Sequence, residues 1–308
     1  PLRELAAMGG TPDASNPKRH FYVPAGNKLY VSYLRFTGGK VCSDQNIPAC
    51  YGGSILGTGT NSVVSVLSSM FMGCTTDLDC AFTAGSIKVH NGAIALIRRS
   101  TFLKSQAIGC GAVAIYSGVA GSVIEDSTFE LCSASVSAGG AVCVNFAGTV
   151  VTIRDSTFSG NVGTLNGGAI NMYNTVTLRL SGGKNIFDSN VALSNVGKQI
   201  SKVSDYNPIT LVFDLCPAGT FQPTSIPTTS DYFIENDFAG CPLSCPAGKT
   251  TANFPEYAER KGNDQATWCT ADCPAGSYCP GTAGGPMACP VEATKYILVD
   301  NTDTCEAS

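Results

Sequence analysis

The chain has 308 residues, a net charge of −4, 14% charged residues, 34 glycines and 15 cysteines. This composition favours a turn-rich folded chain with room for two domains, and it argues against disorder. Nucleic acid is not an expected partner, because the only basic cluster is the short run at residues 17–20. No apolar run reaches the length of a membrane-spanning helix. The many cysteines favour an oxidising location, extracellular or at the cell surface.

Residues 1–28 are predicted to form an N-terminal arm or cap. The segment is polar, begins at Pro1 with no visible signal peptide, and has Phe21-Tyr22-Val23 as its strongly apolar patch. The region that follows, around residues 29–34, is too apolar to be left open if it begins a stack of strands. We therefore expect the patch to dock on a neighbouring subunit, and the alternative is that it folds back as a cap.

Residues 29–208 contain a repeat with a period of about 30 residues. Each period has a phenylalanine that closes a β-like run and, further on, a glycine that opens another, as in Gly140-Ala141-Val142. The phenylalanines are Phe36, Phe71, Phe102, Phe129, Phe158 and Phe187. A fixed period of this length is typical of a solenoid.

The repeat unit is predicted to be β. One period contains an apolar run at 139–146, a run rich in β-branched residues at 149–154, and a shorter stretch that starts at Ser156. Three short strands in a unit of this size indicate one coil of a parallel β-helix. We therefore predict an all-β protein with a right-handed parallel β-helix of about six coils.

Stacking of such coils gives the repeated residues physical roles. The phenylalanines should form an internal aromatic ladder, and the Gly-Gly pairs should allow turns with positive φ. Three residues after each phenylalanine stands a small polar or thiol residue that we expect to point inward at a corner of the coil. These residues are Cys74, Ser105, Cys132, Asn161 and Asn190. An inward asparagine can bond to the backbone of the next coil.

Two motifs carry a family resemblance. Phe158-Ser159-Gly160-Asn161 and Phe187-Asp188-Ser189-Asn190 have the pattern F-x-x-N, and Gly167-Gly168-Ala169-Ile170 reads G-G-A-I. Together they resemble the repeat of the polymorphic outer-membrane proteins over roughly residues 30–200. The resemblance implies a right-handed parallel β-helix and an adhesive passenger domain. The chain departs from that family by using Cys or Ser at the earlier corners and by having no barrel after the repeats.

Seven cysteines lie in the repeat region. Cys42 with Cys50, and Cys74 with Cys80, bracket the extra residues of the two longest periods, so we expect a disulfide at the neck of each insertion. Cys110, Cys132 and Cys143 remain, an odd number, so one of them is either a buried free thiol or a bond to another chain. Asp77 and Asp79, within the second insertion, are a weak calcium candidate, and a solvated loop tip is the simpler interpretation.

A charged cluster precedes the phenylalanines on successive coils. Counting back from each phenylalanine gives one row of Arg98, Glu125 and Arg154 and a second row of Arg99, Asp126, Asp155 and Lys184. Clustered carboxylates serve β-helix enzymes that cleave acidic polysaccharides. However, the signs alternate along the first row, as they do in an ion-pair ladder between stacked strands. We therefore interpret the cluster as structural and predict no catalytic residue in it.

Other catalytic chemistry has less support. The chain has two histidines, His20 and His90, and the sequence names no partner for either, so both are interpreted as surface residues. The glycine pairs recur in every period, which marks them as turn residues and not as a phosphate-binding loop.

Residues 209–308 are predicted to be a disulfide-rich domain with little regular structure. Cys-Pro-Ala-Gly occurs three times, at 216–219, 245–248 and 273–276. The eight cysteines of the segment are Cys216, Cys241, Cys245, Cys269, Cys273, Cys279, Cys289 and Cys305. So thin a segment needs disulfides in place of a core, although Cys241 with Cys245 also has the spacing of a zinc ligand pair.

The run Cys273-Pro-Ala-Gly-Ser-Tyr-Cys279 resembles ephrin-receptor-like and tumour-necrosis-receptor-like modules. Joined to β-helix coils, such modules look like the large surface proteins of algae and other protists. Residues 223–230, rich in Thr, Ser and Pro, either carry O-glycans or form a flexible loop.

The sequence therefore favours a non-catalytic extracellular structural or adhesive protein, without cofactor or metal. Its expected partners are other protein chains and glycans, in a surface appendage such as a flagellar hair or in an extracellular filament. The alternative is a carbohydrate-active β-helix enzyme, a polysaccharide lyase or glycoside hydrolase, or a glycan-binding module.

Overall fold

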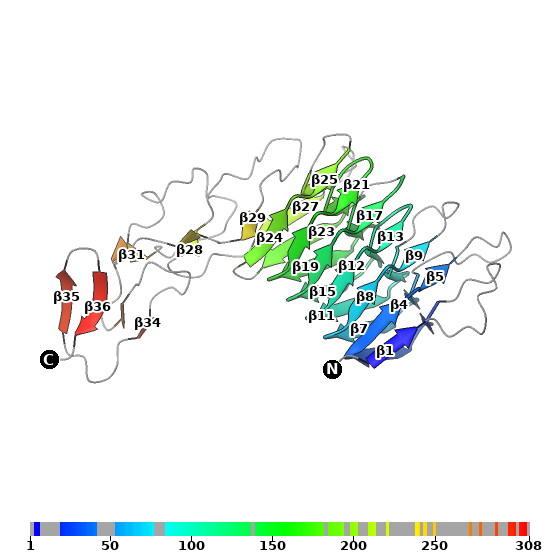
Figure 1. Ribbon diagram of the computed structural model, residues 1–308, viewed down its shortest axis with the longest axis horizontal. Coiled ribbons are helices and arrows are strands. Elements are labelled where there is room, and N and C mark those ends of the chain that lie inside the picture. The colour runs from blue at the N-terminus through cyan, green and yellow to red at the C-terminus, as the bar shows by residue number, and fades with distance from the viewer. Residues whose placement is uncertain are drawn as a thin grey trace. The chain divides into compact units, whose positions relative to one another are not determined.

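A computed structural model describes residues 3–6, 19–41, 53–76, 84–136, 139–181, 184–193, 198–202 and 209–213, followed by short strands between 220 and 306. These residues contain strands and no helix, and the strands build a parallel β-helix (Figure 1), which confirms the predicted fold class. The chain divides into two compact units. The first comprises Pro1–Arg179, Ile186–Leu211 and Pro227–Asp237, and the second comprises Leu180–Asn185, Val212–Ile226 and Phe238–Ser308.

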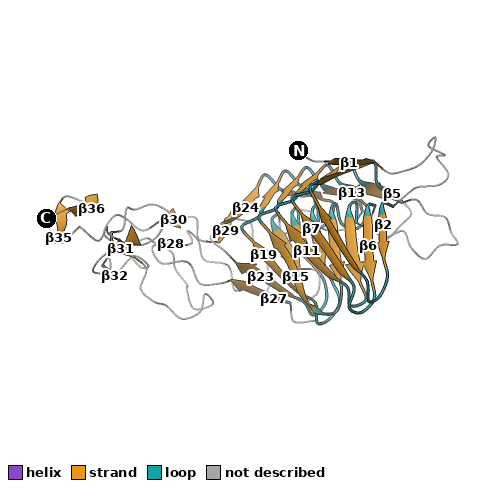
Figure 2. Cartoon of the chain, turned by 90° about the horizontal axis from the view of Figure 1, so that it is seen from below, coloured by secondary structure: helices purple, strands orange, loops and turns teal. Residues whose placement is uncertain are grey.

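Four sheets of parallel strands form the walls of the β-helix, and neighbouring strands in a sheet come from successive coils (Figure 2). Sheet A contains β1 (Arg3–Ala6), β4 (Leu34–Thr37), β8 (Met70–Met72), β12 (Thr101–Leu103), β16 (Thr128–Glu130), β20 (Thr157–Ser159) and β24 (Lys184–Asp188). Sheet B contains β2 (Phe21–Val23), β6 (Ile55–Thr58), β10 (Ile87–His90), β14 (Val113–Tyr116), β18 (Val142–Val144), β22 (Ile170–Met172) and β26 (Ile200–Lys202). Sheet C contains β3 (Lys28–Ser32), β7 (Val63–Leu67), β11 (Ile94–Arg98), β15 (Ala120–Glu125), β19 (Val150–Arg154), β23 (Thr177–Ser181) and β27 (Thr210–Phe213). Sheet D contains β5 (Lys40–Val41), β9 (Thr75–Thr76), β13 (Gln106–Ala107), β17 (Ser133–Ala134), β21 (Val162–Gly163) and β25 (Val191–Ala192).

Each coil thus contributes one strand to each of the four sheets, in the chain order B, C, A, D. Over the described residues this gives six coils of four strands each, the first from β2 to β5 and the last from β22 to β25. Going from the first coil to the last takes five turns of the β-helix. The prediction of three strands per coil was wrong, because it missed the fourth strand, which lies in sheet D. That strand is two residues long, as in Gln106–Ala107, which is too short to produce a recognisable alternation of apolar and polar residues.

The phenylalanines stack through the centre of the β-helix, as predicted. The stack consists of Phe36, Phe71, Phe102, Phe129, Phe158 and Phe187, and all six side chains are 0% exposed. Neighbouring ring centroids lie 4.4 to 5.0 Å apart with interplanar angles of 2° to 6°. The rings follow the strand register, in which Phe102 pairs with Phe71 on one side and with Phe129 on the other.

A ladder of buried serines runs beside the phenylalanines, two residues before each of the four central ones. The backbone N–H of Ser69 donates to the hydroxyl of Ser100 (3.2 Å), and that of Ser100 donates to Ser127 (3.1 Å). The next step, from Ser127 to Ser156, repeats the bond at 3.2 Å. Each hydroxyl also donates to the carbonyl two residues before it, such as that of Arg98 for Ser100. The serines therefore bond one coil to the next at the corner between sheets C and A.

The corner between sheets A and D carries the predicted inward polar residues. The side-chain oxygen of Asn161 accepts a hydrogen bond from the backbone N–H of Cys132 (3.0 Å), and its amide nitrogen donates to the carbonyl of Phe129 (3.0 Å). Asn190 does the same one coil later, accepting from the N–H of Asn161 and donating to the carbonyl of Phe158. These side chains satisfy backbone groups that the turn leaves unpaired inside the core.

The corner before sheet B requires glycine for two different reasons. The first residue of each Gly-Gly pair has positive φ, 93° at Gly139 and 67° at Gly167, as predicted. The second, Gly140 or Gly168, is needed because a Cβ there would collide with a backbone carbonyl of the next coil, at Gly168 and Lys198 respectively. Gly53, Gly85 and Gly111 stand at the same position in earlier coils and meet the same obstruction.

The N-terminal segment is part of the solenoid. Residues Phe21–Val23 form β2, which pairs with β6 in sheet B, and Arg3–Ala6 form β1, which pairs with β4 in sheet A. The apolar patch at 21–23 is therefore a strand of the first coil, so the predicted arm does not extend to residue 28, and docking on a neighbouring subunit stays a prediction. The strand follows from register: Phe21 aligns with Ile55, an inward residue of the next coil.

The second unit contains antiparallel pairs of short strands. These are β28 (Thr220–Phe221) with β30 (Leu243–Ser244), β31 (Lys249–Thr250) with β32 (Ala271–Asp272), β33 (Ser277–Tyr278) with β34 (Met287–Ala288), and β35 (Lys295–Val299) with β36 (Thr302–Glu306), besides β29 (Phe238–Gly240). Cys305 lies in β36, and the other seven cysteines after residue 209 lie outside the described residues. The disulfides predicted for this segment therefore stay predictions.

Phe129 tests the central stack, because it has a phenylalanine neighbour on each side. We expect Phe129→Ala to lower the free energy of unfolding by about 3–5 kcal/mol, through lost burial and the cavity that remains. The measurement is chemical unfolding followed by circular dichroism. Phe146→Ala is the matched control, since Phe146 is 48% exposed and should change stability far less. Equal losses in the two variants would contradict the stacked register.

Candidate functional site

The charged row predicted from the sequence is an ion-pair ladder on the outside of the coils. Arg98 pairs with Glu125 and Glu125 with Arg154 in the register of sheet C. The Arg98 Nε lies 3.1 Å from Glu125 Oε2, and the Arg154 Nη1 lies 3.4 Å from Glu125 Oε1. Each oxygen of the carboxylate thus faces a guanidinium. The arginine side chains are half exposed, so each pair adds only about 0–1 kcal/mol.

The second row does not form a continuous strand surface. Arg99, Asp126 and Asp155 occupy the turn after sheet C with φ of 48°, 48° and 47°. The backbone N–H groups of Arg99 and Asp126 bond to the next coil, at the carbonyls of Glu125 (2.9 Å) and Arg154 (3.0 Å). Lys184 begins β24, and its side chain lies outside the described ones. The structure therefore assigns these residues to a turn position that favours small polar or charged side chains over β-branched ones.

The three carboxylates of the charged cluster occupy two kinds of position. Glu125 is bracketed by two arginines, and Asp126 and Asp155 lie on successive coils of one turn. Within the described part of the chain, no group of three or more His, Cys, Asp or Glu side chains is placed to hold a metal ion. Asp77 and Asp79 lie outside the described residues.

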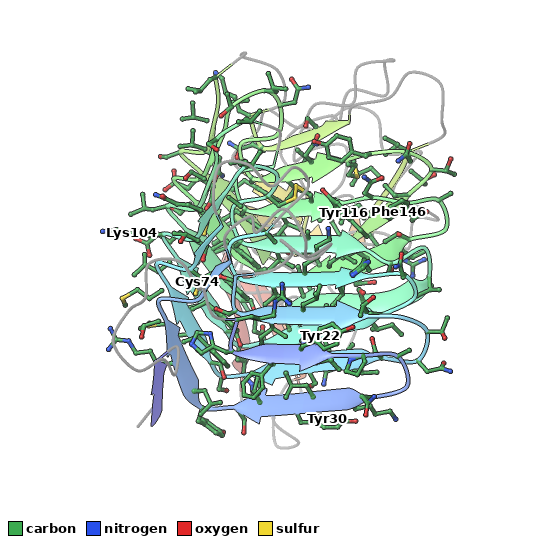
Figure 3. The ribbon with its side chains drawn as sticks, turned by 90° about the vertical axis from the view of Figure 1, so that its right-hand side faces the viewer. Tyr22, Tyr30, Cys74, Lys104, Tyr116 and Phe146 are labelled. Carbon is green, nitrogen blue, oxygen red and sulfur yellow. A yellow bond between two sulfur atoms is a disulfide. The ribbon has the colours of Figure 1, made fainter. Side chains whose placement is uncertain are left out.

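The outer face of sheet B is unusual because several outward side chains of its central strands are buried. Lys88 is 3% exposed and Tyr116 is also 3% exposed, although both point away from the core of the coils. The Lys88 Nζ lies 5.0 Å from the centroid of the Tyr116 ring, a cation–π contact. Phe146 lies edge-on to the same ring at 5.9 Å (Figure 3). The sequence did not predict this cluster. A strand sequence shows which side chains alternate between the inner and outer faces, but it does not show what covers the outer face.

Burial and charge shift the pKa values of this cluster. Burial, followed by the charge of Arg19, lowers the pKa of Lys88 to about 7. Burial also lowers the pKa of Arg19 to about 10 and that of His90 below its usual range, and it raises the pKa of Tyr116. A lysine with a pKa near neutrality is a nucleophile or base in some enzymes. Here Lys88 is almost inaccessible, so the arrangement fits a desolvated structural cation better than a reacting amine.

The two histidines differ in setting. His20 lies in the first coil, where its ring meets the Phe36 ring edge-on at 5.3 Å, so it packs at the end of the phenylalanine stack. His90 ends β10 and is partly buried on the outer face of sheet B. The prediction that both are plain surface residues was wrong for His20, because its register beside β2 directs it toward the aromatic core.

The structure pairs two of the three remaining cysteines of the β-helix and leaves the third as a free thiol. Cys110 and Cys143 form a disulfide across 33 residues, while Cys132 is a buried free thiol, as one of the alternatives had it. Cys74 is also a buried free thiol that accepts a hydrogen bond from the Ser54 hydroxyl (3.0 Å). The expected bond from Cys74 to Cys80 is therefore absent, because Cys74 points inward at its corner. Cys80, Cys42 and Cys50 have no described side chain.

The described residues contain no helix able to span a membrane. No protein-family model, no curated protein and no solved structure matches this chain.

Lys88 gives a pH test of the outer cluster. In the unfolded chain a lysine titrates near ~10.4, so between pH 7 and that value the unfolded state binds more protons than the folded state. The contribution of Lys88 to the free energy of unfolding is therefore least favourable below pH 7 and improves as the pH rises. We expect the stability of Lys88→Met relative to the parent to be highest near pH 6 and to decline toward pH ~10.

The measurement is urea unfolding of both proteins across this pH range. Lys28→Met is the matched control, because Lys28 is an exposed lysine on β3. A pH profile for Lys88→Met that is the same as that for Lys28→Met would contradict the buried position of Lys88.

Thiol labelling tests the cysteine assignments. We expect a cross-linked peptide pair containing Cys110 and Cys143 after non-reducing digestion and mass spectrometry. Cys132 should resist alkylation in the folded protein, because it is fully buried and burial raises its thiol pKa to about 12. It should react after denaturation. Rapid labelling of Cys132 in the folded protein, or free Cys110 and Cys143 thiols, would show that the assignment is wrong.

Proposed function

We propose that this chain is a non-catalytic extracellular structural or adhesive protein, a β-helix rod with a disulfide-rich stalk. It would serve as a segment or subunit of a cell-surface appendage or an extracellular filament. The observation that carries this proposal is the continuity of the side-chain ladders. Phenylalanine, serine and the corner polar residues repeat through successive coils and bond each coil to the next. Conserving these contacts along the whole stack is what a rigid rod requires.

The outer surface supports the same reading. The Glu125 carboxylate is engaged by Arg98 and Arg154, so its charge is used to hold neighbouring strands together. The Cys110–Cys143 disulfide and the many cysteines of the C-terminal segment fit an oxidising location. Parallel β-helices also occur as enzymes, so the alternative function is a carbohydrate-active enzyme or a glycan-binding module.

A panel of acidic and neutral polysaccharides separates the two functions. With and without calcium, the protein is expected to release no reducing ends and no unsaturated products. The matched variant carries Glu125→Gln, Asp126→Asn and Asp155→Asn together, and it should behave like the parent. Turnover by the parent that disappears in this variant would establish the enzyme. Negative-stain images of native material are expected to show fibrils or elongated assemblies, and isolated particles alone would count against the filament.

A further inference from the structure

Most of the exposed large apolar side chains on the later coils lie on one wall of the β-helix. They belong to sheet D and the turns that flank it, on the coils of β17, β21 and β25 (Figure 1). Their exposures are 45% for Leu131, 57% for Val136, 51% for Leu165, 43% for Val191 and 61% for Leu193. We name this group the sheet D patch. A cluster of this kind, unlike single exposed leucines, marks an interaction surface.

The strand register makes the patch contiguous. The outward row of sheet D runs from Gln106 and Ser133 to Val162 and Val191, so it changes from polar to apolar along the stack. Leu131 packs over Gly160 of the next coil, where the missing side chain leaves room for it. Leu193 donates its backbone N–H to the carbonyl of Gly163 (3.0 Å), which places it on the coil beside Leu165.

Charged residues stand at the two ends of the patch. Lys104 occupies the A–D turn one coil before Leu131, and Asp188 ends β24 one coil after Gly160. The backbone bonds of Lys104 to Glu130, Leu131 to Ser159 and Gly160 to Asp188 show these single-coil steps. Lys104 and Asp188 are therefore three coils apart, or about 14 Å at the strand spacing of ~4.8 Å. An apolar centre with a charged rim is the usual anatomy of a protein interface.

We propose that the sheet D patch binds a second copy of this chain across a two-fold axis. An axis between the coils of β17 and β21 places Leu131 and Val136 of each copy opposite the coil of Leu165 in the other, while Val191 and Leu193 face the coil of Gln106. It also places Lys104 of one copy opposite Asp188 of the other, twice over by symmetry. The remaining rim acid, Glu130, then faces the coil of Ser159 and no like charge. This complementarity of the rim is what selects a second copy as the occupant.

The proposal rests on the proposed function, since it states how two rods would associate side by side. The patch spans three coils, so the interface lies at the small end of specific interfaces, below or near ~1,200 Å² in total. The association is therefore expected to be weak and to depend on protein concentration. It leaves the coil ends and the ion-pair ladder on sheet C unoccupied.

Sedimentation of the full chain over a wide range of concentration tests the proposal. We expect the weight-average mass to rise from monomer to dimer, and Val136→Lys or Leu165→Lys to weaken dimerisation at least tenfold. Phe146→Lys is the matched control, because Phe146 is similarly exposed but lies on a different wall from Lys104 (Figure 3). A monomer at every concentration, or equal weakening by the control, would overturn the proposal and leave a different partner for the patch.

Charge exchange tests the orientation. Lys104→Glu and Asp188→Lys should each weaken dimerisation, and the double variant should restore it, because the two charges are then exchanged across the axis. Failure of the double variant to recover would overturn the two-fold arrangement. These outcomes are separate from polysaccharide turnover, which would defeat the non-catalytic function and leave the dimer unaffected.

Discussion

The structure depends on one constraint: each coil must stack on the next at the spacing of one hydrogen-bonded strand. At that distance every side chain faces its equivalent in the neighbouring coil, so a position that suits one coil must suit all of them. Flat rings satisfy this condition, which is why the phenylalanine centroids are separated by 4.4 to 5.0 Å. Where no side chain fits, as at Gly140 beneath the Gly168 carbonyl, only glycine is possible. The sequence repeats because every coil must satisfy this same constraint.

The same constraint shapes the outer surface. Like charges stacked at this distance would repel each other. Because Arg98, Glu125 and Arg154 alternate in sign, the neighbouring strands attract each other instead. Polar groups inside the corners meet a stricter condition, because a buried N–H or carbonyl must find a partner. Asn161 and Asn190 meet it with side chains that bond an N–H and a carbonyl of the preceding coil. Ser100 meets it at the corner between sheets C and A. The exterior tolerates variation that the corners do not.

The period of the sequence predicted the features that depend only on the alignment of equivalent residues in successive coils. The phenylalanine stack, the strands at 142–144 and 150–154, and the Arg98–Glu125–Arg154 ladder all follow from aligning equivalent residues. The misses depend on information outside the period. The bond between Cys110 and Cys143 joins different positions of the repeat, and the burial of Lys88 depends on what covers sheet B. The serine ladder, by contrast, was readable, since a serine stands two residues before Phe71, Phe102, Phe129 and Phe158.

The repeat changes at the glycine corner that follows Gly168. At the glycine corner, the residue after Gly168 in the stack is Lys198, whose side chain would obstruct a further coil placed as closely as the earlier ones. Beside it, Gln199 stands where alanines precede β14, β18 and β22, and its side-chain oxygen accepts a hydrogen bond from the Asn190 amide (2.7 Å). That bond satisfies the last asparagine of the corner ladder without another coil. Lys198 and Gln199 therefore break the repeat at its glycine corner, and the Gln199 side chain supplies to Asn190 the acceptor that a further asparagine of the ladder would have provided.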